Sequence, residues 1–263
     1  MGSPHWAFCG FVDLLSWSVG FLMTGASLSE RWVCIDQEAT MGAGFDGFPK
    51  AGIKFLKDLE KNNSRDWFNA NKAIYEQNVK APAEHFLGEV QLALEKKLGG
   101  EVVPKLFRIH RDVRFSKDKT PYNSHVRMAF FGKPGKTGQG VHSGFYFSLD
   151  TKGVFYGAGS MNLEKQALEK YRQAVCDVRH GPALDKLMKA LVKKGCRLSE
   201  PDLKRVPSGY DVDPAYAPLL QYKGLGAWLD TKGHAKATGR DAVKQAVSAF
   251  TTVRPLHDFL MDL

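Results

Sequence analysis

The stretch Gly144-Phe-Tyr-Phe-Ser-Leu-Asp-Thr-Lys-Gly-Val-Phe-Tyr156 decides the fold class of this chain. Gly144–Leu149 and Val154–Tyr156 are rich in aromatic and β-branched or aliphatic residues, which is typical of strands. Asp150-Thr-Lys-Gly153 between them has the composition of a tight turn. The stretch therefore predicts an antiparallel β-hairpin, since strands joined by so short a link run in opposite directions.

Two segments before the hairpin also show the period of two that strands have. Val126–Phe131 is one of them. In Leu106–Phe115 the odd positions are apolar except for Arg111, and the even positions are charged or polar, which predicts a strand with one apolar and one charged face. Sequential strands with short links predict an antiparallel meander, in a sheet of about four to six strands.

Helical periodicity appears on both sides of this block. Before it, helices are predicted over Gly52–Lys61, from the N-cap Ser64 to Val79, and from Pro82 to Gly99. After it, helices are predicted over Leu163–Val175, from Pro182 to Gly195, in Pro214–Tyr222, and over residues 241–262, where Pro255 breaks or restarts the helix. The order predicts an α+β fold with a central antiparallel sheet flanked by N-terminal and C-terminal helices.

The first 43 residues differ from the rest of the chain. Residues 6–28 are mostly apolar but lack the basic start of a signal peptide, and a membrane-spanning helix would bury Asp13. Regular patterning begins just after Met41. We interpret residues 1–43 as an extension, either disordered or translated from an upstream start, with a peripheral membrane anchor as the alternative. Residues 44–263 are predicted to form a single α+β domain.

Charge and cysteine usage narrow the class of protein. The chain has a formal net charge of +9, of which residues 1–43 contribute −3 (one arginine, four acids), so the remainder carries +12. Such an excess suits nucleic acid, phosphorylated ligands or an acidic membrane surface, or is that of a basic, soluble protein with no such partner. The four cysteines form no CxxC motif and lack zinc spacing, which predicts free thiols in the cytoplasm and no metal site.

Two glycine-containing segments resemble ligand loops without meeting their requirements. Gly132-Lys-Pro-Gly-Lys-Thr137 has Phe130 where a phosphate loop needs its first glycine, and no helix start follows, so we interpret it as a hairpin connection. Gly157-Ala-Gly159 is interpreted as the tight exit of a strand. No metalloprotease or serine-hydrolase pattern occurs either, and no cofactor is predicted.

The densest group of chemically active side chains is Arg108-Ile-His-Arg-Asp-Val-Arg-Phe-Ser-Lys-Asp-Lys-Thr-Pro-Tyr122. On the predicted strand, Arg108, Asp112 and Arg114 share one face. There two guanidinium groups can hold the carboxylate and still bind an anion. Arg111 is expected to point to the other face, toward the core, and to need a buried partner.

Side chains after the predicted strand complete the candidate site. Lys119 and Tyr122 are expected to reach back from a turn, and His125 is expected to titrate near neutral pH. Asp112 or Asp118 is a candidate general base, or only the orienter of an arginine, and spacing leaves this open. The predicted ligand-binding residues are Arg108, Arg111, Arg114, Lys119, Tyr122 and His125.

Three functions agree with this pattern. The first is binding of, or chemistry on, a small ligand with a phosphate or carboxylate group. The second is nucleic-acid binding through the positive charge, including Lys133–Lys136 and Lys232–Arg240. The third is a structural or interaction role, in which the motif is an internal ion-pair network. The sequence leaves open whether the protein is an enzyme and what its oligomeric state is.

The motif also carries a resemblance to a known family. It fits R-x-x-R-D-x-R-F-x-x-[DN]-K-x-x-Y, the signature of the bacterial family called domain of unknown function 2461, at every fixed position. The flanking segments Asn62–Phe68 and Leu203–Tyr210 look like that family too, and the resemblance covers about residues 45–262. It implies no established activity.

Overall fold

The computed structural model describes residues 44–132 and 143–263. The expected N-terminal extension and the glycine-containing segment after Gly132 lie outside these residues, so the interpretations of both stay predictions. Gly42–Leu263 forms one compact unit by itself. No helix in the described part of the chain is long and apolar enough to cross a membrane.

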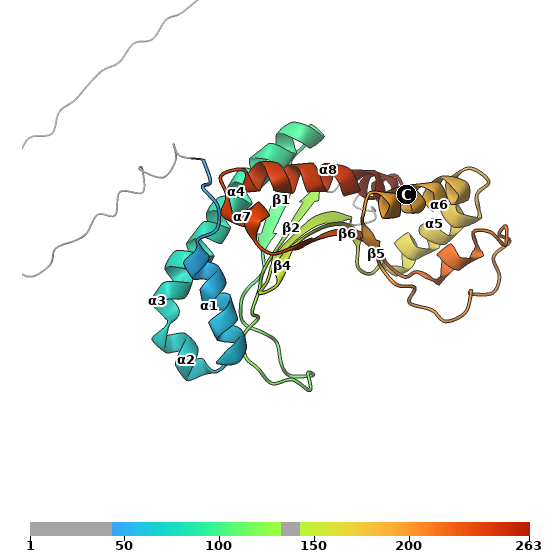
Figure 1. Cartoon of the computed structure of the whole chain (residues 1–263). Helices are drawn as coiled ribbons and strands as arrows, with labels where there is room; N and C mark the ends of the chain where they lie inside the picture. Colours follow the sequence, from blue (N-terminus) through green and yellow to red (C-terminus); the bar gives the residue numbers. More distant parts are fainter. Residues whose placement is uncertain (1–43, 133–142) are drawn as a thin grey trace, which may run out of the picture. The chain divides into compact units, whose positions relative to one another are not determined.

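A six-stranded antiparallel sheet forms the centre of this unit (Figure 1), which confirms the predicted α+β class. The strand order is β1-β2-β3-β4-β6-β5, so the first four strands form an antiparallel meander, in which β2, β3 and β4 match predicted strands, and β6 pairs with β4. The strands are β1 (Val102–Leu106), β2 (Val126–Gly132), β3 (Gly144–Leu149), β4 (Gly153–Ser160), β5 (Arg197–Leu198) and β6 (Leu225–Lys232).

Helices from both ends of the chain flank the sheet, as predicted. The N-terminal group consists of α1 (Lys50–Lys61), α2 (Arg65–Ala70), α3 (Lys72–Tyr75), the π-helix η2 (Glu76–Lys80) and α4 (Ala81–Leu98). The C-terminal group consists of α5 (Lys165–Cys176), α6 (His180–Lys193), the 3-10 helix η3 (Ala217–Gln221), α7 (Ala235–Thr238) and α8 (Ala242–Met261).

Several of these elements begin and end where local chemistry predicts. The hydroxyl of Ser64 accepts a hydrogen bond from the backbone N–H of Trp67 at 3.3 Å, which caps α2. Gly99 ends α4 with a φ of 73°, a conformation that glycine adopts without steric cost. In the β3–β4 turn, Oδ1 of Asp150 accepts from the N–H of Gly153 at 2.9 Å. The predicted hairpin is therefore held by its own turn residues.

The core lies between one face of the sheet and the helices α4 and α8. The ring of Phe86 in α4 lies 4.7 Å from that of Phe147 in β3, measured between centroids. Phe250 of α8 lies 5.3 Å from Phe145 and 6.0 Å from Tyr156. Because side chains alternate between the two faces of a strand, the residues between these aromatic rings point to the opposite face, which neither α4 nor α8 covers.

The predicted strand Leu106–Phe115 is wrong. Strand β1 ends before Phe107, whose N–H makes a last backbone hydrogen bond to β2 at 3.0 Å. Between Phe107 and Phe115 the backbone makes only one isolated β-bridge, between His110 and Tyr122. The side chain of Phe115 is 95% exposed. The alternation marks an extended chain, but a strand also needs a neighbour to supply a hydrogen-bond ladder.

Three other predictions are wrong in detail. The helix expected over Ser64–Val79 is divided into α2, α3 and η2. Gly157 and Gly159 lie inside β4 rather than at a strand exit. Pro255 does not break α8, because buried apolar residues on both sides of it hold the helix in the core despite the lost backbone hydrogen bond. Strand β1 shares only Leu106 with a predicted strand, and strands β5 and β6 have no counterpart among the predicted elements.

Candidate functional site

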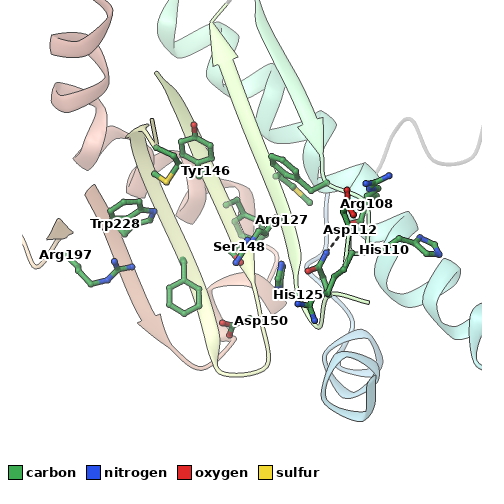
Figure 2. A pocket seen from close by; sticks show the side chains of 17 residues that line it. Arg108, His110, Asp112, His125, Arg127, Tyr146, Ser148, Asp150, Arg197 and Trp228 are labelled. Carbon is green, nitrogen blue, oxygen red and sulfur yellow. Dashed lines mark hydrogen bonds between the residues drawn. The ribbon is translucent and has the colours of Figure 1, made fainter. Parts of the chain in front are cut away.

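A cavity of about 750 Å³ lies on the sheet face that α4 and α8 leave uncovered. This volume falls in the range of pockets that hold small molecules. The loop after β1 forms one wall and the strands β5 and β6 form the other. Figure 2 shows Arg108 near one end, Trp228 and Arg197 at the other, and Arg127 between them.

The strand register arranges the floor of the cavity in rows. Arg127, Ser148, Phe155 and Asp230 are successive cross-strand partners on β2, β3, β4 and β6. Neighbouring strands are about 4.8 Å apart, so the backbones of Arg127 and Phe155 are about 10 Å apart. This first row runs from a guanidinium group through a hydroxyl to an aromatic ring.

A second row contains Tyr146, Gly157, Trp228 and Arg197. A Cβ on Gly157 would lie 2.4 Å from Cδ1 of Trp228, and one on Gly226 would lie 2.4 Å from its Cη2. The indole therefore lies directly against the backbone at two glycines. A side chain at either position would displace it, so these glycines fix where the ring sits.

Arg197 holds Trp228 from the edge of the sheet. Its guanidinium carbon lies 4.9 Å from the centroid of the indole, within the range of cation–π interaction. Its Nε and Nη2 donate to the carboxylate of Asp230 at 2.7 and 3.3 Å. Because the carboxylate already matches its charge, Arg197 serves to position the aromatic end of the cavity.

Arg108 and Arg127 are different, since both are exposed and line the cavity, and neither guanidinium group is held by a carboxylate, although the charge of Arg108 helps to lower the pKa of Asp112. Neither guanidinium group makes a hydrogen bond or ion pair with any of the residues that the structure describes. By contrast, Arg111 in the same cavity donates to Asp118 at 2.6 Å. Guanidinium groups with free N–H donors bind phosphate and carboxylate groups well, because the oxygens of these anions accept hydrogen bonds from the planar pair of N–H donors.

The structure divides the predicted ligand-binding residues into two groups. Those that line the cavity are Arg108, Arg111 and His125, and the candidate base Asp112 lies beside them. Those that do not line it are Arg114, Lys119 and Tyr122, and the candidate base Asp118 is also absent from the lining.

Two members of the second group tie the motif loop to itself. Arg114 donates to Asp112 through Nε at 3.0 Å and Nη2 at 2.7 Å, while its side chain is 76% exposed. Lys119 donates through Nζ to the carbonyl oxygen of Val113 at 3.0 Å. Arg111, expected to need a buried partner, pairs instead with Asp118, which is 59% exposed. These contacts stabilise the loop that forms one wall of the cavity.

Tyr122 anchors the same loop to the helices. Its buried ring stacks on Phe68 of α2, with centroids 4.1 Å apart and planes 16° apart. Its backbone N–H donates to Oδ1 of Asn63 at 3.0 Å, and its carbonyl oxygen accepts from Nδ2 at 2.9 Å. The segment Asn62–Phe68, noted above for its resemblance to a family, thus packs directly against the motif.

Most of the chain matches the model of a known protein family. The family model described as Conserved hypothetical protein (DUF2461) matches residues 51–259. The chain belongs to this family. The resemblance to domain of unknown function 2461 is therefore confirmed, and the family description assigns no function. No curated protein matches the sequence.

The two candidate bases of this DUF2461 domain both have lowered pKa values. The backbone N–H of Thr120, and then the guanidinium of Arg111, lower the pKa of Asp118 to about 2. Hydrogen bonds from the side chain and backbone of Arg114 lower the pKa of Asp112. A general base at neutral pH works best with a pKa near the pH of the reaction. The geometry favours the role of arginine orienter for both carboxylates.

His125 does not have the pKa expected of it. Burial, and next the positive charge of Arg127, lower the pKa of His125 from 6.5 to about 4. The expected titration near neutral pH is wrong, because the ring is held neutral there. His125 therefore offers the cavity an uncharged imidazole at neutral pH.

We expect acid to destabilise the domain partly through His125. Between pH 6.5 and 4 the unfolded chain binds a proton that the native ring rejects, so the free energy of unfolding falls as the pH falls through this window. A His125→Gln variant should lose less stability than the wild type between about pH 7 and pH 5. Urea denaturation at both pH values measures this, and equal losses would contradict it.

No group of three His, Cys, Asp or Glu residues within 44–132 and 143–263 is arranged to hold a metal ion. Cys176 and Cys196 are free thiols. The groups that the described cavity offers to a ligand include guanidinium, imidazole, hydroxyl, amide and carboxylate groups, together with aromatic rings.

The cavity residues on the strands are not among the predicted site residues. Arg127 is the single charged residue in Val126–Phe131, and it points away from the core that its neighbours enter. The same alternation would have placed Tyr146 and Ser148 beside it, on the uncovered face. Trp228 gave no such signal, because strand β6 was not predicted.

Proposed function

We propose that this domain binds a small anionic ligand, bearing a phosphate or carboxylate group, with Arg127 and Arg108 as the anion-binding groups. The observation that supports the proposal is the pair of guanidinium groups that line a cavity of about 750 Å³ and make no hydrogen bond or ion pair with the described residues. The charge of +12 outside residues 1–43 also attracts anions from solution. The proposal moves the anion-binding role from Arg114 and Lys119, which are engaged in the loop.

A purely structural motif explains less of the site. An internal network accounts for Arg111, Asp118, Asp112 and Arg114, whose charges match one another. It gives no reason for Arg127, which arises from a different strand and has no partner among the described residues. An anion supplied from outside the chain would provide that partner.

Nucleic-acid binding is the second candidate, because the cavity floor presents aromatic rings as well as cations. Single strands bind such surfaces through base stacking and backbone charge. Salt separates the two functions. Affinity for a strand that contacts several cations falls by orders of magnitude as salt rises a few-fold, whereas a ligand held by two guanidinium groups releases few counterions and loses much less.

We expect Arg127→Ala to weaken anion binding at least tenfold, because hydrogen bonds to charged groups contribute about 1.5–3 kcal/mol. Arg127 is exposed, so the fold should survive. The measurement is a calorimetric titration with phosphate, sulfate and a set of phosphorylated and carboxylated metabolites. A bound anion at about 100 times its Kd should also raise Tm, since it stabilises the native state by roughly 2.7 kcal/mol.

Arg205→Ala is the matched control. It removes the same charge from an exposed residue that does not line the cavity, so the affinity should stay within about twofold of the wild type. An absence of binding by every anion tested would overturn the proposal. Equal losses in the two variants would show general charge attraction rather than a site at Arg127.

A further inference from the structure

We infer that the ligand of this cavity carries a planar aromatic ring beside its anionic group, as a nucleoside monophosphate does. The inference rests on the proposed function, because the cavity must first accept an anion. It adds the chemistry of the rest of the ligand, and it comes from the strands rather than from the motif loop.

The first observation is where the aromatic side chains lie. Tyr146, Phe155 and Trp228 line the cavity, and each is only partly buried. Helices α4 and α8 lie on the other face of the sheet, where Phe86 packs on Phe147 and Phe250 packs on Phe145. An antiparallel sheet with one free face usually turns polar side chains to it. Three rings on such a face form an apolar surface that a ligand can cover.

The second observation is that the Trp228 ring is fixed before any ligand arrives. The backbone at Gly157 and Gly226 supports the indole, and Arg197, itself held by Asp230, lies against the ring. A ring already held in place loses little conformational freedom when it is covered, so binding keeps more of the stacking energy. The side chain of Arg197 is 56% exposed, and a guanidinium group is a further group on which a base can stack.

The third observation is the order of groups along the first row. Arg127 stands at one end, Phe155 two strands away, and Ser148 between them. The hydroxyl of Ser148 makes no hydrogen bond with the residues that the structure describes. The row therefore presents an anion-binding group, a free hydroxyl and a ring across about 10 Å of sheet. A ring joined to a phosphate through a polar linker matches this order.

Simpler ligands match only part of the cavity. Inorganic phosphate would pair with Arg127 and leave the rings in water. An uncharged aromatic compound would cover Phe155 and leave both unmatched guanidinium groups without a partner. A ligand with both parts satisfies both ends, and stacking on an aromatic side chain contributes enough to be measured.

The test compares ligands that differ only in the ring. Adenosine 5′-monophosphate and phenyl phosphate carry a ring, and ribose 5-phosphate and inorganic phosphate do not. Calorimetric titration of the full chain should show at least one ring-bearing probe binding on the order of tenfold more tightly than ribose 5-phosphate. The same probe should change the fluorescence of Trp228, and this change should be absent in Trp228→Phe.

Phe155→Leu separates the two parts of the site. It keeps an apolar side chain of similar size, so the sheet should fold, but it removes the ring. We expect the preference for the ring-bearing probe to fall several-fold in this variant, while affinity for ribose 5-phosphate stays within about twofold.

Each other outcome has a distinct meaning. Equal affinities for the probes with and without a ring, all weakened by Arg127→Ala, would overturn this inference and leave the proposed function intact. No binding of any probe would overturn both. Binding of a single-stranded oligonucleotide without binding of either ring-bearing probe would overturn the inference in favour of a surface that binds nucleic-acid strands.

Discussion

Gly159→Ala is expected to lower the free energy of unfolding by about 3 kcal/mol or more. Gly159 has a φ of 135°, which side-chain-bearing residues rarely adopt. An added Cβ would lie 2.1 Å from the carbonyl oxygen of Leu225 and 2.7 Å from the Cα of Gly226. Both are backbone atoms of the paired strand, so relief requires β4 and β6 to separate.

Gly233→Ala is the matched control for this change. Gly233 also has a positive φ, of 73°, but nothing lies within 4 Å of an added Cβ. It should therefore cost only backbone strain, about 1 kcal/mol. Urea denaturation of both variants measures the difference. Equal losses would show that strand separation adds nothing, and that the β4–β6 contact is looser than the structure has it.

Phe250→Ala is expected to lower the free energy of unfolding by about 3–5 kcal/mol. The fully buried ring of Phe250 packs against Phe130, Phe145 and Tyr156 on three neighbouring strands. Its removal leaves a cavity between α8 and the sheet, because the surrounding backbone cannot close over it. For a domain of this size, such a loss lowers Tm by roughly 6–20 °C.

Thr251→Ala changes the next residue of the same helix and serves as its control. Thr251 is exposed, and alanine favours helix, so the free energy of unfolding should change by no more than about 0.5 kcal/mol. Thermal unfolding followed by circular dichroism compares the variants. A small effect of Phe250→Ala would mean that α8 contributes little to the core.

The two faces of the sheet differ in what covers them. The face under α4 and α8 provides the stability that Phe250 probes. The opposite face carries Arg127, Phe155 and Trp228, which line the cavity and which we propose bind a ligand. Changes at the three residues should therefore alter binding more than folding, whereas Phe250→Ala should act through stability.

The motif shows how far composition can locate a site. The many charged residues in Arg108–Tyr122 predicted a site there. In the structure this segment forms one wall of the cavity, which is lined by Arg108, Arg111, Asp112 and the nearby His125. Because Leu106–Phe115 was predicted to be a strand, Arg114 was predicted to bind the anionic ligand. In the structure the chain leaves the sheet, and the guanidinium of Arg114 turns to Asp112, two residues away. A period of two shows an extended backbone but not whether a second strand lies beside it.

The sequence by itself determined the α+β class, the strands β2, β3 and β4 and the helices on either side, because each depends on local periodicity and on turn residues such as Asp150 and Gly153. It also determined the family, through a contiguous motif. Only the tertiary structure decided that β6 pairs with β4, which brings Trp228 to the opposite end of the cavity from Arg108, and that Arg127 has no acidic partner among the described residues. Both depend on contacts between segments far apart in the chain. A local sequence pattern does not indicate which distant strand will pair with β4, or which charged side chain will lack a partner of opposite charge.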